Sequence, residues 1–365
     1  MLRSLLIAVS CLATGGTGGA QGADVAGFHV AETQRLFHPD HPRHWRGAQT
    51  QALITRIWYP ADAAVRETPH DIGEAGHPIF RGHPLAVDAP LSSAQATWPL
   101  LVMSHGIGGS ADSLDWLGSA LAEAGYVVVA VNHPGTNALE PLTREGFILL
   151  WERATDLSDA LDGVLADPTF GSHLDRARIG AVGFSLGGYT VLELAGARTV
   201  PDALQAFCLS PAADAICHPP EMDRFKGKVD AAFTPSPETA ASLARAGDSY
   251  WDERVKAVFA IAPALGEAFG PGSFNDIRVP IALIAGDADP IAPVGTNIRR
   301  FGGFLPSASL SLLPGVGHYT FLDTCVPAMV ERLATLCKDA PGVDREAIHQ
   351  EAIDRARAFF AGTLG

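Results

Sequence analysis

The sequence has few basic side chains and no long uninterrupted apolar stretch. Lys and Arg number 26 against 40 Asp and Glu, so the formal net charge is −14 with His neutral. An acidic surface of this kind repels phosphate groups, which argues against nucleic acid and anionic membrane as partners. The apolar run near the N-terminus, residues 5–13, is too short to span a bilayer, and no other stretch resembles a membrane span. We therefore expect no stable membrane insertion.

Cysteine is also scarce, and its spacing disfavours a zinc site. Of the five Cys, one lies near the N-terminus and the other four form two close pairs, Cys208 with Cys217 and Cys325 with Cys337. Neither pair has the C-x-x-C spacing common in zinc sites. In an oxidising compartment, an even number of locally paired Cys favours two disulfides. The alternative is four buried free thiols.

The N-terminus has the pattern of a secretory signal. Arg3 supplies a positive charge, residues 5–13 form a short apolar core, and small residues follow over 14–23. The prediction is a signal peptide over residues 1–22 and a periplasmic or extracellular protein. Cys11 raises a lipoprotein alternative, but the residues before it form a poor lipobox.

The remaining chain, residues 23–365, is long enough for one large α/β domain with insertions or for two domains, and 47% of the whole sequence is apolar. Strands and helices alternate from about residue 98 to 197, the pattern of parallel βαβ units. The expected strands cover residues 25–37, 52–59, 99–104, 126–131, 179–184, 255–261, 281–285 and 308–313. The expected helices cover residues 111–124, 147–165, 189–197, 294–304, 326–335 and 344–360. The fold class is therefore α/β, with a mostly parallel, doubly wound sheet and helices on both faces.

Three segments stand outside this alternation. Residues 60–96 are rich in Pro, Gly, His and Asp, and we expect little regular structure there. His38, His41 and His44 could bind a metal, but the interleaved prolines favour an irregular surface loop. Residues 199–252 break the alternation directly after the helix at 189–197, which makes them a candidate cap over a ligand site. The alternative is a peripheral excursion that packs away from the site.

A serine between two glycines follows the strand at 179–184 and precedes the helix at 189–197. Residues 183–187, GFSLG, fit G-x-S-x-G, the pattern of a nucleophile elbow. The glycines are needed because a side chain two residues before or after the serine would clash with the crossing strand or helix. Such a turn raises the hydroxyl of Ser185 above the sheet and leaves the N–H of Leu186 at a helix N-terminus, aimed at developing negative charge.

A serine nucleophile requires a base, and the base requires a carboxylate that orients it. The strand at 281–285 is followed by Asp287 and Asp289, and the strand at 308–313 is followed by a loop that ends in His318. The order Ser, Asp, His after successive strands predicts His318 as the base. Asp289 is favoured as the acid because it lies deeper in its loop, whereas Asp287 is better placed to brace that loop.

The loop after the strand at 99–104 supplies the fourth element. Residues 105–107, HGI, occupy the place from which the second backbone donor of an oxyanion hole comes. We therefore expect the N–H groups of Ile107 and Leu186 to form the oxyanion hole.

Taken together, these motifs resemble the α/β-hydrolase superfamily. The similarity is greatest to the bacterial group of predicted dienelactone hydrolases, which is related to platelet-activating-factor acetylhydrolases and to cutinase-like polyester hydrolases. It covers about residues 98–325 in pieces. The residues that carry it are Ser104-His105-Gly106-Ile107-Gly108-Gly109, Asn132-His133-Pro134-Gly135, Gly183-Phe184-Ser185-Leu186-Gly187-Gly188, Ala285-Gly286-Asp287-Ala288-Asp289-Pro290 and Gly317-His318. In cutinase-like acid loops the second Asp is catalytic, which the resemblance carries over to Asp289.

The resemblance implies an α/β-hydrolase fold and a secreted serine hydrolase that cleaves small carboxylic esters without a metal or organic cofactor. Two departures argue against polymers as substrates. Residues 262–265, APAL, lack the Trp that polyester-degrading cutinases carry there, and the insertion at 199–252 is absent from those open enzymes. Dienelactone hydrolases use Cys where this chain has Ser185. The alternatives are an amidase, a phospholipase-like acetylhydrolase or an acyltransferase with the same triad, or a non-catalytic binding protein of the same fold.

Overall fold

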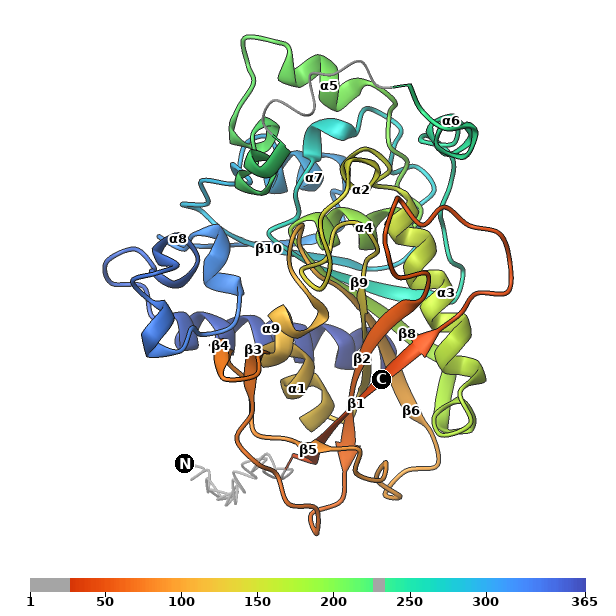
Figure 1. The fold of residues 1–365 in the computed structure, drawn as a ribbon, viewed down its shortest axis with the longest axis vertical. Helices are drawn as coiled ribbons and strands as arrows, with labels where there is room; N and C mark the ends of the chain where they lie inside the picture. The colour runs from red at the N-terminus through yellow and green to blue at the C-terminus, as the bar shows by residue number, and fades with distance from the viewer. Residues whose placement is uncertain (1–26, 226–233) are drawn as a thin grey trace, which may run out of the picture.

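A nine-stranded sheet in the order β11-β10-β9-β8-β6-β7-β2-β1-β5 runs through the molecule (Figure 1). The structure, a computed structural model, describes residues 27–225 and 234–365, so the expected signal peptide over 1–22 and Cys11 lie outside the described residues. The strands are β1 (His29–Phe37), β2 (Leu53–Ala61), β3 (Asp71–Glu74), β4 (His77–Arg81), β5 (Ala86–Val87), β6 (Trp98–Ser104), β7 (Val127–Asn132), β8 (Leu174–Phe184), β9 (Val255–Ile261), β10 (Ile281–Gly286) and β11 (Ser309–Leu313).

The part of the sheet from β11 to β7 is parallel, and β2 joins it in antiparallel pairing. The central strands β6 and β7 are buried along their whole length, which explains their nearly continuous apolar sequence. The carboxyl ends of parallel strands meet at one edge of a sheet, and ligands bind in the crevice outside such an edge. The mostly parallel arrangement agrees with the sequence-based prediction.

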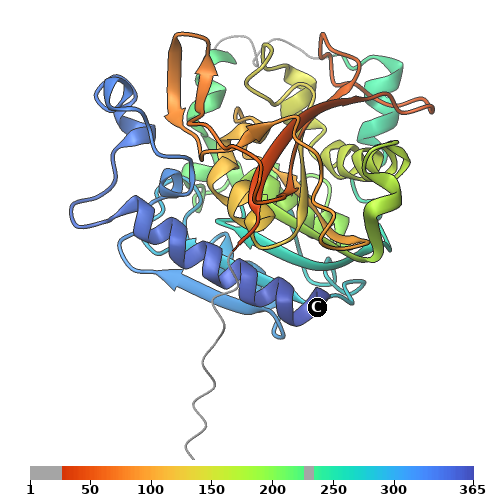
Figure 2. The ribbon, with the colours of Figure 1, turned by 90° about the horizontal axis from the view of Figure 1, so that it is seen from below.

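Helices cover both faces of the sheet. They are α1 (Asp115–Glu123), α2 (Arg144–Ile148), α3 (Glu152–Ala166), α4 (Leu186–Leu194), α5 (Ala203–Cys208), α6 (Pro237–Leu243), α7 (Ile298–Phe304), α8 (Ala334–Cys337) and α9 (Arg345–Leu364). Helices α1 and α9 contact each other on one face, and α3 and α4 contact each other on the other. Figure 2 shows α9, in dark blue, running along the sheet. Within the described ranges, no helix is both long enough and apolar enough to cross a bilayer.

Two predicted helices are interrupted in the structure. The helix expected at 147–165 is divided into α2 and α3, because Leu149 leaves helical geometry and packs with Trp151 and Ala246 in a small buried cluster. The helix expected at 326–335 is reduced to the short 3-10 turn Pro327–Met329 and α8. In the first case a tertiary contact overrides the helical periodicity, which no local pattern in the sequence signals.

The prediction of little regular structure over residues 60–96 is wrong for part of that segment. Strands β3 and β4 form an antiparallel hairpin with an irregular register at Gly73, and β5 adds a short edge strand to the main sheet. In the hairpin, Ile72 and Phe80 are buried against Cys325. The apolar side chains of the hairpin are therefore held by a segment that lies far away in the sequence.

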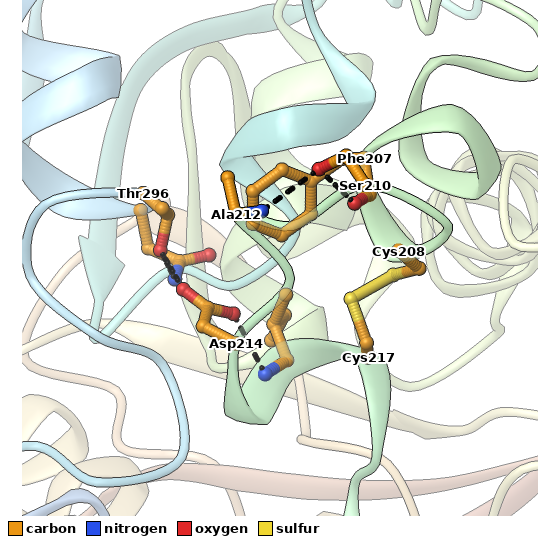
Figure 3. The surroundings of a disulfide bond; sticks show 9 residues. Phe207, Cys208, Ser210, Ala212, Asp214, Cys217 and Thr296 are labelled. Carbon is orange, nitrogen blue, oxygen red and sulfur yellow. Dashed lines mark hydrogen bonds between the residues drawn. A yellow bond between two sulfur atoms is a disulfide. The ribbon is translucent and has the colours of Figure 1, made fainter.

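The insertion over residues 199–252 contains α5, α6 and the short 3-10 turns Ala215–Cys217 and Pro220–Phe225, and Figure 1 shows α5 and α6 at one end of the molecule. Phe233 and the side chain of Phe225, two apolar residues of this segment, lie outside the described part. A disulfide joins Cys208 to Cys217. Asp214 accepts a hydrogen bond from Thr296 Oγ1 at 2.6 Å, as Figure 3 shows, so the insertion is tied to the loop after β10.

Candidate active site

Ser185 lies at the sharp turn between β8 and α4, with φ 57° and ψ −119°. A Cβ atom added to Gly183 would lie 2.1 Å from the carbonyl oxygen of Gly187, and one added to Gly187 would lie 1.9 Å from that of Ser104. Only glycine fits at either position, which is the steric reason for the G-x-S-x-G pattern. The positive φ of a non-glycine residue is strained and is held by the packed elements on both sides.

The structure brings Ser185, His318 and Asp289 together as a continuous hydrogen-bonded chain. His318 Nδ1 lies 2.6 Å from Asp289 Oδ2, and His318 Nε2 lies 2.8 Å from Ser185 Oγ. Because a carboxylate can only accept, Nδ1 carries the proton and donates it, and Nε2 accepts from the serine hydroxyl. All three side chains are buried. Each residue comes from the segment that directly follows a parallel strand, β8, β10 or β11.

The two aspartates of the loop after β10 make different contacts. Asp289 Oδ2 faces His318, and its Oδ1 accepts hydrogen bonds from the N–H groups of Ile291 and Ala292, both at 2.8 Å. Asp287 Oδ1 instead accepts from the N–H of Gly315 at 2.7 Å. Asp287 therefore braces the loop that leads to the histidine, while Asp289 contacts the histidine itself.

The two expected oxyanion donors lie beside the serine. Ile107 and Leu186 both line the cavity above Ser185. The loop that holds Ile107 approaches closely, since a Cβ atom on Gly106 would be 3.2 Å from the Cβ of Ser185. Within residues 27–225 and 234–365, no carbonyl or side chain accepts from either backbone N–H. Both donors are thus free to bind an oxygen that carries developing negative charge.

A buried arginine, Arg153, donates a hydrogen bond to the loop after β6. The Arg153 guanidinium donates to Thr136 Oγ1 at 2.7 Å, to Thr190 Oγ1 at 3.1 Å and to the carbonyl oxygen of His105. Burial lowers the pKa of Arg153 to about 9, which leaves it charged at neutral pH. Because Arg153 binds the carbonyl of His105, it orients the peptide unit directly before the one that carries the N–H of Ile107.

His133 lies near the site but belongs to a separate buried network. Its Nε2 contacts Ser104 Oγ at 2.8 Å and its Nδ1 contacts Asp156 Oδ2 at 2.7 Å. Arg46 donates to Asp156 at 2.5 Å, and Arg43 donates to it as well. Burial lowers the pKa of His133 to about 3, whereas the adjacent arginines hold the pKa of Asp156 well below its usual range. His133 is therefore a neutral bridge beneath the site and does not contact Ser185.

A cavity of about 1220 Å³ opens above the triad. Ser185 and His318 line it, and three of the segments that form its walls lie far apart in the sequence. The insertion contributes Leu204, Ile216 and Met222, the β3–β4 hairpin contributes Ile72, Ile79 and Phe80, and the segment after the histidine loop contributes Met329, Leu333 and Leu336. The lining is mainly apolar, so the cavity suits a substrate with a hydrocarbon part.

One polar contact joins the insertion to the catalytic loop. Tyr319, next to His318, donates a hydrogen bond through its hydroxyl to Glu221 Oε1 at 3.2 Å. Burial and the nearby carboxylate raise the pKa of Tyr319, so its hydroxyl keeps its proton at neutral pH. Sequence reasoning missed Glu221 and both hairpin strands as parts of the site. Only Tyr319, by its position after the base, carried a signal that could have pointed to it.

The second disulfide closes a loop within the wall segment downstream of His318, and one of its cysteines also contacts the hairpin wall. Cys325 is bonded to Cys337, and Cys325 also pairs with Phe80 in an isolated β-bridge. Both Cys pairs that the sequence predicted are thus joined in the structure. The bridge holds the segment downstream of His318 and, through Phe80, fixes that segment against the hairpin.

Three curated relatives are similar to parts of this chain. "Lipase 1" of Moraxella sp. (strain TA144) is 38% identical over 95 residues, which is 26% of each chain. "Cutinase est1" of Thermobifida alba is 32% identical over 58% of this chain and 50% of its own. "Cutinase 2" of Thermobifida cellulosilytica is 32% identical over 61% of each chain. The chain therefore spans between about a quarter and three fifths of the length of these relatives.

Among solved structures, the ferulic acid esterase from Streptomyces cinnamoneus matches with a TM-score of 0.58 and 19% sequence identity, covering 94% of this chain and 92% of that one. This likeness concerns the fold. Residues 101–332, which hold all three triad positions, match the model of the alpha/beta hydrolase family. The predicted fold class is confirmed, and the chain belongs to the alpha/beta hydrolase family.

Proposed function

We propose that the protein hydrolyses small carboxylic esters with Ser185 as nucleophile, His318 as general base and Asp289 as the residue that orients the base. The observation that carries this proposal is the hydrogen-bonded chain from Asp289 through His318 to Ser185 at the floor of a mainly apolar cavity. The names of the relatives, lipase and cutinase, and that of the structural neighbour, ferulic acid esterase, support an ester as the substrate class.

In the proposed mechanism, Ser185 Oγ attacks the ester carbonyl while His318 Nε2 takes the hydroxyl proton. The carbonyl oxygen becomes an oxyanion and binds the N–H groups of Ile107 and Leu186. His318 then donates its proton to the departing alcohol, which leaves an acyl-enzyme on Ser185. Water, deprotonated by His318, attacks the acyl group and releases the carboxylic acid. Asp289 keeps the proton on Nδ1 throughout and stabilises the imidazolium that forms.

The insertion over 199–252 is proposed to act as a cap that limits substrate size. Its support is positional, because Leu204, Ile216 and Met222 line the same cavity as Ser185. The contacts that attach the cap include the hydrogen bonds from Thr296 to Asp214 and from Tyr319 to Glu221. A covered apolar cavity accepts small soluble esters better than a polymer strand, which would need an open groove.

A periplasmic or extracellular location is part of the same proposal. The two disulfides, Cys208–Cys217 and Cys325–Cys337, support it because such bonds persist in oxidising compartments. The expected signal peptide over residues 1–22 is consistent with it.

A panel of p-nitrophenyl esters from acetate to palmitate, with matched p-nitroanilides and a polyester film, tests the substrate class. We expect fast hydrolysis of short acyl esters, a decline with acyl length, and little release from anilides or film. The Ser185→Ala variant serves as the matched blank for spontaneous hydrolysis. Rates on the film or on the anilides that equal those on short esters would contradict the proposal.

A further inference from the structure

A second cluster of chemically active side chains lies away from the triad. Glu32 on β1, His70 in the loop before β3 and Asp115 at the start of α1 each offer one ligand atom, and these atoms lie within 4.8 Å of one another. Glu32 and Asp115 are buried, at 2% and 1% exposure, while His70 is partly exposed. Three separate elements thus direct one imidazole and two carboxylates to the same point.

Two ligand atoms of this cluster, Glu32 Oε2 and His70 Nε2, do not hydrogen-bond to each other. Glu32 Oε1 accepts from Arg56 at 2.6 Å, but the buried Oε2 has no hydrogen-bond partner in the described part of the chain. His70 Nε2 lies 3.9 Å from Oε2, which is too long for a hydrogen bond. An unpaired carboxylate oxygen at this depth costs free energy unless a cation reaches it.

Asp115 is already oriented by its surroundings. Its Oδ1 accepts from Trp58 Nε1 at 2.9 Å and from Ser119 Oγ at 3.2 Å, and its Oδ2 accepts from the N–H of His83 at 2.6 Å. Hydrogen bonds of this kind fix the orientation of metal-ligating carboxylates and leave further lone pairs available. Asp115 therefore has the geometry of a pre-oriented ligand.

Charge in this region is not balanced by protein cations. Arg56 is shared between Glu32 and Asp112, to which it donates at 2.6 Å each. In residues 27–225 and 234–365, the carboxylate of Asp115 makes no ion pair with Lys or Arg, and the neighbouring Asp323 accepts only from the N–H groups at the start of α1. A dication at this point would neutralise charge that the protein leaves uncompensated.

We propose that Glu32, His70 and Asp115 bind a divalent transition-metal cation, with Zn²⁺ as its first candidate. One imidazole nitrogen with two carboxylate oxygens suits Zn²⁺ better than Ca²⁺ or Mg²⁺, which prefer oxygen ligands alone. Zn–N and Zn–O bonds of about 2.0–2.2 Å hold neighbouring ligand atoms roughly 3–3.5 Å apart. Because the ligand atoms lie within 4.8 Å of one another, binding requires the imidazole of His70 to move closer to the two carboxylates.

A cation at this site would stabilise the β3–β4 hairpin, because the site lies at the base of that hairpin. The carbonyl oxygen of His70 accepts from the N–H of Gly82 at 2.8 Å, and His83 donates to Asp115 just beyond β4. A cation bound here would pin both ends of the hairpin to β1 and α1. Since Ile79 and Phe80 of this hairpin line the cavity, the cation would fix one wall of the active site.

The histidines that precede β2 do not offer a comparable site. His41 Nε2 contacts Asp159 at 2.9 Å, and both nitrogens of His44 are engaged, by the N–H of Arg46 and by Thr239 Oγ1. His41 thus contacts α3 and His44 contacts α6, so both side chains already have partners in distant segments of the chain. His41 consequently provides a matched control for a histidine substitution.

The test is Zn²⁺ binding to chelator-stripped, full-length protein by isothermal titration calorimetry, with metal content by elemental analysis and thermal unfolding in parallel. We expect one Zn²⁺ per chain at this site and a rise in Tm on adding Zn²⁺. His70→Gln and Glu32→Gln should weaken binding at least about 10-fold, the loss seen when even outer-shell groups are removed, and abolish the rise in Tm. His41→Gln should bind as the wild type does. Co²⁺ bound in place of Zn²⁺ should show a visible spectrum that changes in His70→Gln.

Because His70 is partly exposed, His70→Gln should fold even where the buried substitution Glu32→Gln does not, and circular dichroism checks this. Stripped wild-type protein that binds no Zn²⁺ would overturn the proposal. Binding and a Co²⁺ spectrum that are equal in wild type and His70→Gln would overturn it as well, as would loss of binding in His41→Gln alone. None of these readouts depends on esterase activity.

Discussion

The triad and the walls of the cavity above it come from two different kinds of segment. Ser185, Asp289 and His318 each directly follow a parallel strand, so their positions depend on the sheet itself. Much of the wall comes from the insertion, from the β3–β4 hairpin and from the segment around α8, which are connections outside the parallel sheet. Two disulfides and a few polar contacts hold these connections in place.

We infer that the segments at the strand ends determine the chemical step, whereas the segments that form the cavity walls determine which ester is preferred. Changes at the strand ends should abolish turnover with little effect on which ester is preferred. Changes in the walls should alter the preference and the stability while leaving the chemical step largely intact. The predictions that follow test this separation in order of decreasing effect.

Replacing Ser185 with Ala should lower ester turnover by about 10⁶-fold, the loss seen when a serine nucleophile is removed from such a triad. The fold should remain, because the strained turn depends on Gly183 and Gly187 and not on the hydroxyl. Steady-state kinetics on the best ester measures the loss, and circular dichroism checks the fold. Activity above a tenth of the wild-type rate would place the nucleophile elsewhere.

Replacing Asp289 with Asn should lower turnover by about 10⁴-fold, since the amide no longer holds the proton on Nδ1 of His318. Asp287→Asn is the matched control in the same loop, and it should act mainly on stability, because Asp287 contacts the N–H of Gly315 and not the imidazole. Kinetics and thermal unfolding of both variants decide the matter. A larger kinetic loss in Asp287→Asn would reverse the assignment.

Removing the disulfides tests the walls. Replacing Cys208 and Cys217 with Ser, or Cys325 and Cys337 with Ser, should each lower the free energy of unfolding by roughly 2–3 kcal/mol at most, because each bridge closes a short loop. Replacing Cys325 and Cys337 should also raise KM for longer acyl esters, because Cys325 contacts the hairpin wall at Phe80. Denaturant unfolding and the ester panel measure these effects. A loss of kcat as large as that of Asp289→Asn would contradict the claim that the cavity walls act on substrate preference and not on the chemical step.

The buried network beneath the triad gives a prediction that concerns stability alone, namely its pH dependence. The pKa of His133 is lowered to about 3 in the folded protein, while an unfolded His titrates near its ordinary value of 6.5. As pH falls below 6.5, His133 becomes protonated in the unfolded chain but stays neutral in the folded chain. The free energy of unfolding should therefore fall between pH 6.5 and about 3 on this account.

His133→Gln removes this term, so the wild type should lose more stability than the variant between pH 7 and pH 5 in urea unfolding. His41→Gln is the control, because its partner Asp159 raises the pKa of His41 and its contribution has the opposite sign. Parallel slopes for wild type and His133→Gln would show that His133 is not held neutral.

The sequence carried enough information to place the catalytic edge but not the cavity walls. The elbow glycines, the apolar run of β7 and the order of Ser185, Asp289 and His318 are local patterns with one steric or chemical explanation. The hairpin was missed because its apolar residues Ile72 and Phe80 pack against Cys325 and residues around it, far along the chain.

The same limit applies to buried polar groups. Nothing near Arg153 in sequence indicates that it binds Thr136, Thr190 and the carbonyl of His105. Likewise, the break at Leu149 results from a contact with Ala246, and Glu221 reaches Tyr319 only in the folded chain. These features depend on contacts between segments that are far apart in the sequence. Sequence periodicity indicates only the secondary structure that each segment favours locally.

The most direct test of the account is to label the protein with a fluorophosphonate and locate the adduct by peptide mass spectrometry. Such a probe reacts with a serine only where a base activates it and an oxyanion hole receives the phosphoryl oxygen. The account predicts one adduct, on Ser185, with matching loss of ester hydrolysis, and none in Ser185→Ala. An adduct on another serine, or full esterase activity in protein that carries no adduct after exhaustive labelling, would contradict it.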